Sequence, residues 1–278
     1  MDAGVITPQS VTDEHVFRKS DLLQSKLHEL LRVLGNTAGL TCVDVGCENG
    51  KISSLLRQEG GEWHSVAPSP SAEGSMKALV GDSVYLMDGL QLPFKKKQFD
   101  IVIVMDSLEK VAADGGLIEE CHRVLKPDGR LILSVTHVKS WSLADLVRRA
   151  IGLTPENRGL VRKGYTESQL FNILKNGFDV VNMRSYSRFW VQFVDAMVQF
   201  YLRRHPPLSD SDGKRLMRAY SIAGPFFALA TQLDMFLFFT RGHCLIASAK
   251  RRTWRPREAP VLVDGRSISE AVLSKAAR

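Results

Sequence analysis

The stretch Val43-Asp44-Val45-Gly46-Cys47-Glu48-Asn49-Gly50 (residues 43–50) decides the fold of this chain. A short apolar strand runs into a glycine turn, and the residues that follow are typical of a helix. Gly46 and Gly50 let the backbone approach a ligand closely, and the start of the next helix offers unpaired N–H groups. The stretch therefore predicts a ligand-binding turn at the carboxyl end of a strand.

Apolar strands alternate with helices on both sides of this turn. A leucine-rich helix is expected over residues 20–34, because its leucines recur at helical spacing and Gly35 follows them. Strands are predicted at 41–45, 62–67, 83–87, 99–105 and 130–135, with helices at 51–58, 71–79 and 116–125 between them. This β-α-β order predicts a parallel sheet with right-handed crossovers.

The composition is that of an ordinary globular protein. The chain has 278 residues, 44% hydrophobic and 24% charged, enough for one large α/β domain. Its cysteines, Cys42, Cys47, Cys121 and Cys244, are scattered, so we expect neither a disulfide framework nor a metal site. The first twenty residues carry acids and no apolar core, so we expect a cytoplasmic protein without a secretory signal.

Further motifs follow the glycine turn in order. Asp88-Gly89 ends the third strand, Leu92-Pro93-Phe94 comes next, Phe99-Asp100 opens the fourth strand, and residues 123–129 (RVLKPDG) lead into the fifth. With these motifs, residues 40–140 resemble a class I S-adenosylmethionine-dependent methyltransferase of the quinone-biosynthesis type. The resemblance implies a Rossmann-like, doubly wound, mostly parallel seven-stranded α/β sheet, with S-adenosyl-L-methionine as cofactor.

The resemblance also implies which positions hold the cofactor, at the ends of the first four strands. They are Asp44, Gly46, Cys47 and Gly50 at the methionine end, Ala67 at the ribose, Asp88 and Gly89 at the adenine, and Met105, Asp106 and Ser107 beneath the sulfonium.

Two positions depart from the family's pattern. Glu48 stands where the family usually has glycine, and Ala67 where it usually has an acid that holds the ribose hydroxyls. Losing those hydrogen bonds would cost about 1.5–3 kcal/mol each. A non-catalytic methyltransferase-like subunit that binds a membrane or a partner is therefore the alternative to an enzyme. The substitution Ala67→Asp would tighten cofactor binding in a working site and do little in a collapsed one.

Few side chains offer acid–base chemistry at the predicted site. Methyl transfer mainly needs an aligned acceptor and the exclusion of water, although an oxygen or carbon acceptor benefits from a base. His137, just past the fifth strand, is the catalytic candidate, with a structural hydrogen bond as its alternative role. Tyr165 is a candidate for contact with the acceptor.

A long insertion separates the last two predicted strands, 178–184 and 243–249. By the resemblance these strands are antiparallel neighbours, and the sixth runs parallel to the first five, so the insertion should stand over the substrate pocket. The predicted organisation is an N-terminal helical segment (1–39), a methyltransferase core (40–185 and 242–252), a hydrophobic helical cap (186–241) and a basic tail (253–278).

Two apolar segments fill the insertion. Residues 186–202 carry a narrow polar stripe and a wide apolar arc, in which Trp190 and Phe193 are candidates for contact with the acceptor. Residues 219–240 approach the ~20 residues needed to cross a bilayer. Gly224-Pro225 and Asp234 argue against a simple span.

Two interpretations of these segments stay open. They form a hydrophobic lid or homodimer face, or they attach the protein peripherally to the inner face of an anionic membrane, from which it takes a lipid-like acceptor. Basic residues flank them: Arg203, Arg204, Arg215, Arg218, Arg241, Lys250, Arg251, Arg252, Arg255 and Arg257. These basic residues contribute to a net charge of +7 and bracket the apolar stretches, so we expect an anionic lipid surface as partner rather than nucleic acid, and an apolar, lipid-like or prenylated small molecule as acceptor.

Overall fold

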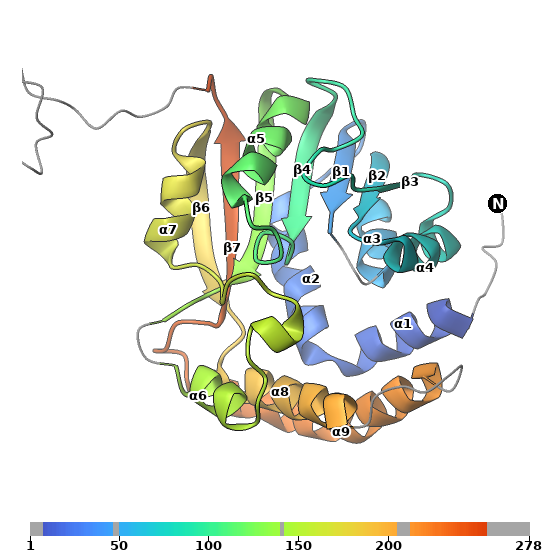
Figure 1. Cartoon of the computed structure of the whole chain (residues 1–278), viewed down its shortest axis with the longest axis vertical. Helices are drawn as coiled ribbons and strands as arrows, with labels where there is room; N and C mark the ends of the chain where they lie inside the picture. Colours follow the sequence, from blue (N-terminus) through green and yellow to red (C-terminus); the bar gives the residue numbers. More distant parts are fainter. Residues whose placement is uncertain (1–7, 47–49, 140–141, 205–211, 255–278) are drawn as a thin grey trace, which may run out of the picture.

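Seven strands form one sheet in the order β3-β2-β1-β4-β5-β7-β6 (Figure 1). They are β1 (Thr41–Val45), β2 (Glu62–Ala67), β3 (Val84–Leu86), β4 (Phe99–Met105), β5 (Leu125–Thr136), β6 (Phe178–Tyr186) and β7 (Cys244–Arg251). The first five strands pair in parallel, and β7 is antiparallel to both of its neighbours. The predicted doubly wound, mostly parallel sheet is therefore confirmed. This computed structural model describes residues 8–46, 50–139, 142–204 and 212–254.

Helices cover both faces of the sheet (Figure 1). Helices α2 (Asp21–Leu34), α3 (Gly50–Arg57) and α4 (Pro70–Val80) pack on one face, where Leu30 and Leu56 are buried. Helices α5 (Asp114–Val124) and α7 (Glu167–Leu174) pack on the other, where Leu117 and Leu170 are buried. Burial of these leucines on two opposite faces supplies the main driving force for the fold.

Capping residues set where several helices begin. The Ser20 hydroxyl accepts a hydrogen bond from the Leu23 N–H at 3.4 Å, which fixes the start of α2. Helix α7 begins with a capping box, in which Thr166 and Gln169 bond each other's backbone N–H groups. Strand β5 begins five residues earlier than predicted, since Leu125 pairs with Phe99 before the turn at residues 127–129.

Within the predicted N-terminal helical segment, the sequence located a helix only at residues 20–34, and helix α1 (Pro8–Lys19) precedes it. Its sequence, PQSVTDEHVFRK, has too few apolar residues to show a helical period. It lies between α9 of the cap and the helices α3 and α4 of the core (Figure 1), where Val16 is buried. Tertiary packing rather than local pattern therefore stabilises this helix.

The insertion between β6 and β7 folds into two long helices, α8 (Phe189–Arg204) and α9 (Asp212–Met235), which lie side by side (Figure 1). With α6 (Leu143–Ala150) and the short 3₁₀ turn η1 (Glu156–Arg158), they stand across the carboxyl ends of the parallel strands. We call α6, η1, α8 and α9 the cap. None of the helices in the described segments combines the length and the hydropathy needed to cross a bilayer.

Asp234, the single acid of the second apolar segment, caps a helix. Its carboxylate accepts hydrogen bonds from the backbone N–H groups of Trp190 at 2.8 Å and Val191 at 3.3 Å. These are orphan donors of the first turn of α8, so the last turn of α9 caps the start of α8. The second segment was expected to stay helical to Thr240, but α9 ends at Met235, one residue after this contact.

Helix α8 turns its polar stripe inward and its apolar arc outward. Gln192 and Asp195 are only 3% and 4% exposed, whereas Trp190, Met197 and Tyr201 are exposed. Val191 and Val198 of the same helix are also buried, in a cluster with residues of α9, so only part of the apolar arc is exposed. The space beneath the cap is therefore polar, and the outer surface of the cap is apolar.

Candidate functional site

The ends of four parallel strands meet at the edge beneath the cap. Val45 lies opposite both Val66 and Val104 in the ladder, so Gly46, Ala67 and Met105 follow at one level of the sheet. The Gly46 N–H donates to the Val66 carbonyl at 2.9 Å, which continues the ladder into the turn. The sheet thus brings together the predicted cofactor-binding positions of β1, β2 and β4.

Gly46 is the tightest point of this edge. Its φ is +79°, and a Cβ atom there would lie 1.4 Å from Ser107 Oγ. The Ser107 hydroxyl itself donates to the Met105 carbonyl at 3.0 Å. Only glycine fits between the end of β1 and the segment after β4, and such close backbone approach is what a nucleotide-type ligand requires at a strand–turn–helix. The backbone here fits the S-adenosylmethionine that the sequence predicts.

Asp106 directs its side chain away from that turn and toward α2. Its backbone is left-handed, with a φ of +48°, and its carboxylate forms an ion pair with the Lys26 ammonium. Burial by itself would lower the pKa of Lys26, but the Asp106 carboxylate outweighs it and raises the pKa. Lys26 therefore stays charged beside the predicted sulfonium position.

Asp44 does not face the ligand edge directly, which corrects its predicted role. Its side chain is fully buried, and it accepts hydrogen bonds from Ser53 at 3.1 Å and Ser65 at 2.8 Å, with Arg57 at 3.7 Å. Burial raises the pKa of this carboxyl from 3.8 to about 6, against the opposing effect of Arg57. Asp44 ties β1, β2 and α3 together beneath the glycine turn, so it is a positioning residue.

The remaining predicted cofactor positions differ in their burial and in their place along the strands and turns. Ala67 has no exposed surface, so Ala67→Asp would bury a carboxylate, and the resulting loss of stability would obscure any gain in cofactor affinity. Asp88 and Gly89 are exposed in the turn after β3, where the Gln91 N–H donates to the Asp88 carbonyl at 2.9 Å. Gly50 begins α3, one residue before the predicted start of that helix, and Cys47 lies outside the described residues.

A cavity of about 460 Å³ opens beside Asp106, and we call it the inner cavity. It lies between the strand edge, α2 and the cap, and its wall is rich in charge. The charged residues that line it are Lys26, Asp106, Glu109, Lys110, Arg148, Arg158 and Asp195. Contact with a wholly apolar acceptor would cost these charged groups their hydration. The cavity therefore favours an acceptor with polar groups, which the sequence did not predict.

Glu109 is a buried acid in this wall. One carboxylate oxygen accepts a hydrogen bond from the Thr136 N–H, while the other is buried and has no partner among the described residues. Burial and then the nearby Asp106 charge raise the pKa of Glu109. A carboxylate with one unpartnered oxygen in a cavity wall can accept a proton from a bound acceptor.

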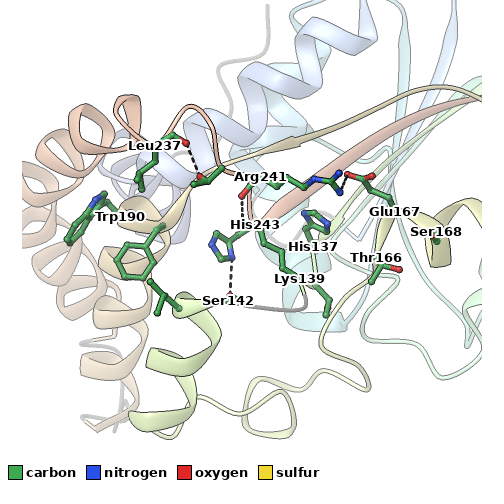
Figure 2. Close-up of a pocket in the computed structure, with 14 residues that line it drawn as sticks. His137, Lys139, Ser142, Thr166, Glu167, Ser168, Trp190, Leu237, Arg241 and His243 are labelled. Carbon is green, nitrogen blue, oxygen red and sulfur yellow. Dashed lines mark hydrogen bonds and ion pairs between the residues drawn. The ribbon is translucent and has the colours of Figure 1, made fainter.

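His137 lies in a second cavity, of about 920 Å³, which we call the outer cavity. Figure 2 shows Trp190 on its cap side, with His137 and Glu167 across from it. The His137 Nδ1 lies 2.9 Å from the Gly242 carbonyl, which can only accept, so Nδ1 carries the proton. Thr136 lines the inner cavity and His137 the outer one, so the strand alternation separates His137 from Asp106.

The family comparison agrees with this geometry. Residues 43–133 match the model of a methyltransferase domain. The chain contains a class I, S-adenosylmethionine-dependent methyltransferase domain. A ubiquinone biosynthesis O-methyltransferase of Pseudomonas paraeruginosa is 31% identical over 105 residues, which are 35% of this chain and 44% of that protein. The chain spans about half the length of the curated relatives it matches, 44% to 49% for the first three.

Solved structures share the fold of this methyltransferase domain over most of the chain. The geranyl diphosphate C-methyltransferase of Streptomyces coelicolor has a TM-score of 0.53 at 16% identity, covering 86% of this chain and 84% of that one. The [4+2]-cyclase SpnF has a TM-score of 0.51 at 19% identity, covering 90% and 84%. Because a cyclase shares the fold, the likeness at this identity shows architecture alone.

The predicted acceptor contacts of the methyltransferase domain do not gather in one place. Tyr165 is buried, and its hydroxyl is engaged by the Leu108 carbonyl at 3.1 Å and Asp114 at 2.9 Å, so we correct its role to a structural one. Trp190 lines the outer cavity. Phe193 lines an apolar groove of about 390 Å³ between α8 and α9. None of the three borders the inner cavity.

Proposed function

We propose that this chain transfers the methyl group of S-adenosylmethionine to a small-molecule acceptor held in the inner cavity. The observation that carries the proposal is the position of Asp106. It is adjacent to Ser107, which contacts Gly46 at the predicted cofactor edge, and it also lines the inner cavity. A molecule in that cavity would lie next to the cofactor's reactive end, as direct transfer requires.

The residues divide into cofactor-holding and acceptor-holding sets. Gly46, Gly50, Asp88 and Ser107 would hold the cofactor, whose sulfonium supplies an already activated methyl group. Glu109, rather than His137, is placed to take the proton that an acceptor hydroxyl loses. The chain is similar to a ubiquinone biosynthesis O-methyltransferase and, in fold, to a geranyl diphosphate C-methyltransferase. Both support an acceptor with an apolar, prenyl-like part. The domain match favours this enzyme over a non-catalytic subunit.

Calorimetric titration with S-adenosylmethionine and S-adenosylhomocysteine tests the proposal. We expect micromolar binding, and we expect Asp88→Asn to weaken it about tenfold, because one charge-assisted hydrogen bond to the adenine is lost. Asp82→Asn, in a neighbouring exposed acid, is the matched control and should bind like the wild type. A folded protein that shows no binding up to millimolar cofactor would refute the enzyme proposal.

We also propose that the outer face of the cap rests on an anionic membrane surface. Four exposed apolar residues lie at the end of α9 and just after it, and we call them the apolar tip: Met235, Phe236, Phe238 and Phe239. The three phenylalanine side chains are 74–76% exposed. The exposed Arg241 follows the tip, and Arg203 and Arg204 end α8. Exposed aromatics bordered by arginines are typical of segments that lie in the interface of an anionic bilayer.

Co-sedimentation with vesicles tests this attachment. We expect the wild type to bind vesicles of mixed neutral and anionic lipid, and Phe236→Ser with Phe238→Ser to bind at least about tenfold more weakly, since each buried phenylalanine contributes about 1.5–3 kcal/mol. Val181→Ser, an exposed apolar residue on β6, is the control. Absence of wild-type binding, or a dimer in solution that the tip substitutions abolish, would contradict the proposal.

A further inference from the structure

Arg148 reaches the inner cavity from α6 of the cap. It is only 6% exposed, and its guanidinium donates one hydrogen bond to the Gln192 side chain. Asp145 lies 3.6 Å away on its other side, an ion pair within the same helix. The Nε atom of Arg148 is buried and has no acceptor among the described residues. A buried guanidinium donor without a partner is uncommon, and here it belongs to a residue that lines a cavity.

Arg158 reaches the same cavity from η1. It is half-buried and has neither an ion pair nor a hydrogen bond from its side chain to any described residue. Burial and then the charge of Arg148 lower the pKa of Arg158, while the charges of Asp195, Asp106 and Glu109 act in the opposite direction. The two guanidinium groups therefore lie close enough to repel each other. The arrangement costs stability in the free protein, and an anion between the two groups would offset that cost.

The acids of the inner cavity do not neutralise these two arginines. Asp106 is already paired with Lys26, and one carboxylate oxygen of Glu109 accepts the Thr136 backbone N–H. Asp195 interacts electrostatically with both arginines. Its carboxylate accepts a hydrogen bond from Gln199 at 2.6 Å, however, and within the described residues it forms no ion pair with either arginine. Positive charge is therefore in excess at the cap side of the cavity.

We propose that Arg148 and Arg158 bind an anionic group, a carboxylate or a phosphate monoester, carried by the methyl acceptor. The inference rests on the proposed function and narrows its acceptor to an acidic molecule. Guanidinium groups match carboxylate and phosphate oxygens with paired hydrogen bonds, and they discriminate best where water is excluded. The acid anchored at the cap side would leave the rest of the acceptor directed toward Asp106 and the cofactor edge.

Titrations with three eight-carbon probes test this subsite in the full chain. Octyl phosphate, octanoate and octanol share an alkyl chain and differ in the head group. We expect at least one of the two anions to bind at least about tenfold more tightly than octanol, and the tighter anion to identify the group. Arg158→Gln should abolish that preference, and Arg158→Lys should restore part of it. Arg149→Gln, at an exposed arginine on α6 next to Arg148, should leave it unchanged.

The outcomes separate this inference from the proposed function. Each variant is also titrated with S-adenosylhomocysteine, whose binding should stay at the wild-type value in Arg158→Gln, and this shows that the variant is folded. Equal binding of the three probes, no anion binding up to millimolar concentration, or an unchanged preference in Arg158→Gln would overturn the anion subsite. Loss of S-adenosylhomocysteine binding in the wild type would instead overturn the proposed function.

Discussion

Gly46→Ala is expected to lower the free energy of unfolding by about 3 kcal/mol and to weaken cofactor binding by at least about a hundredfold. The new Cβ would lie 1.4 Å from Ser107 Oγ and 2.7 Å from its Cβ, so the turn or the segment after β4 must move. Displacement of about 1 Å at an aligned site is enough to cost that factor. Urea unfolding and S-adenosylhomocysteine calorimetry measure the two effects.

Two further variants isolate the cause of this effect. Gly81→Ala has nearly the same backbone, with a φ of +80°, but nothing within 4 Å of the added Cβ, so it should cost only about 1 kcal/mol of strain. Adding Ser107→Gly to Gly46→Ala removes the overlapping side chain and should recover most of the lost stability. If Gly46→Ala behaves like Gly81→Ala, the close contact does not exist in solution.

Asp44→Asn is expected to change how stability depends on pH. The folded pKa of Asp44 is about 6, raised by burial from 3.8, so its carboxyl holds a proton in the folded state that the unfolded chain has lost. The free energy of unfolding of the wild type should therefore fall as pH rises from about 4 to about 6. The variant lacks this contribution. The difference in free energy of unfolding between the wild type and the variant should therefore change by about 3 kcal/mol over this pH range. Urea unfolding at several pH values measures it.

Asp100→Asn is a control for which the dependence of stability on pH should have the opposite sign. Although partial burial works in the other direction, the Lys126 ammonium at 2.7 Å and the Thr41 N–H lower the pKa of Asp100. Its contribution to stability is therefore present above the ordinary aspartate pKa and is lost as pH falls. Other buried acids stay in both members of each pair and cancel in the comparison. Parallel pH curves for the wild type and Asp44→Asn would refute the assignment.

The sheet was predictable because its signals are local. The strands at residues 41–45, 62–67 and 99–105 were predicted to the residue, since each is a short apolar run bounded by turn or glycine signals. The glycine turn and its partner segments follow from strand order, because parallel strands end at one edge. Helix α1 was missed since packing against α9 and the core, rather than its own pattern, stabilises it.

The inner cavity was not predictable in the same way. Its wall takes Lys26 from α2, Arg148 from α6, Arg158 from η1 and Asp195 from α8, which are far apart in the chain and belong to no motif. The one available signal was the polar stripe of α8, whose members Gln192 and Asp195 face the cavity. The stripe showed that one face of this helix is polar. Whether that face points inward or outward is decided by tertiary packing, which the stripe does not show.

The α8–α9 part of the cap leaves the sheet and returns to it at paired positions. Tyr186 at the end of β6 and Cys244 at the start of β7 are opposite each other in the antiparallel ladder. The sheet would therefore need only a short hairpin loop at this point, so lengthening the connection costs little closure entropy. Part of the wall of the inner cavity is consequently carried by a stretch that is separable from the cofactor edge. A lineage could exchange α8 and α9, and with them Gln192 and Asp195 of that wall, in a single recombination event while the ladder kept its register.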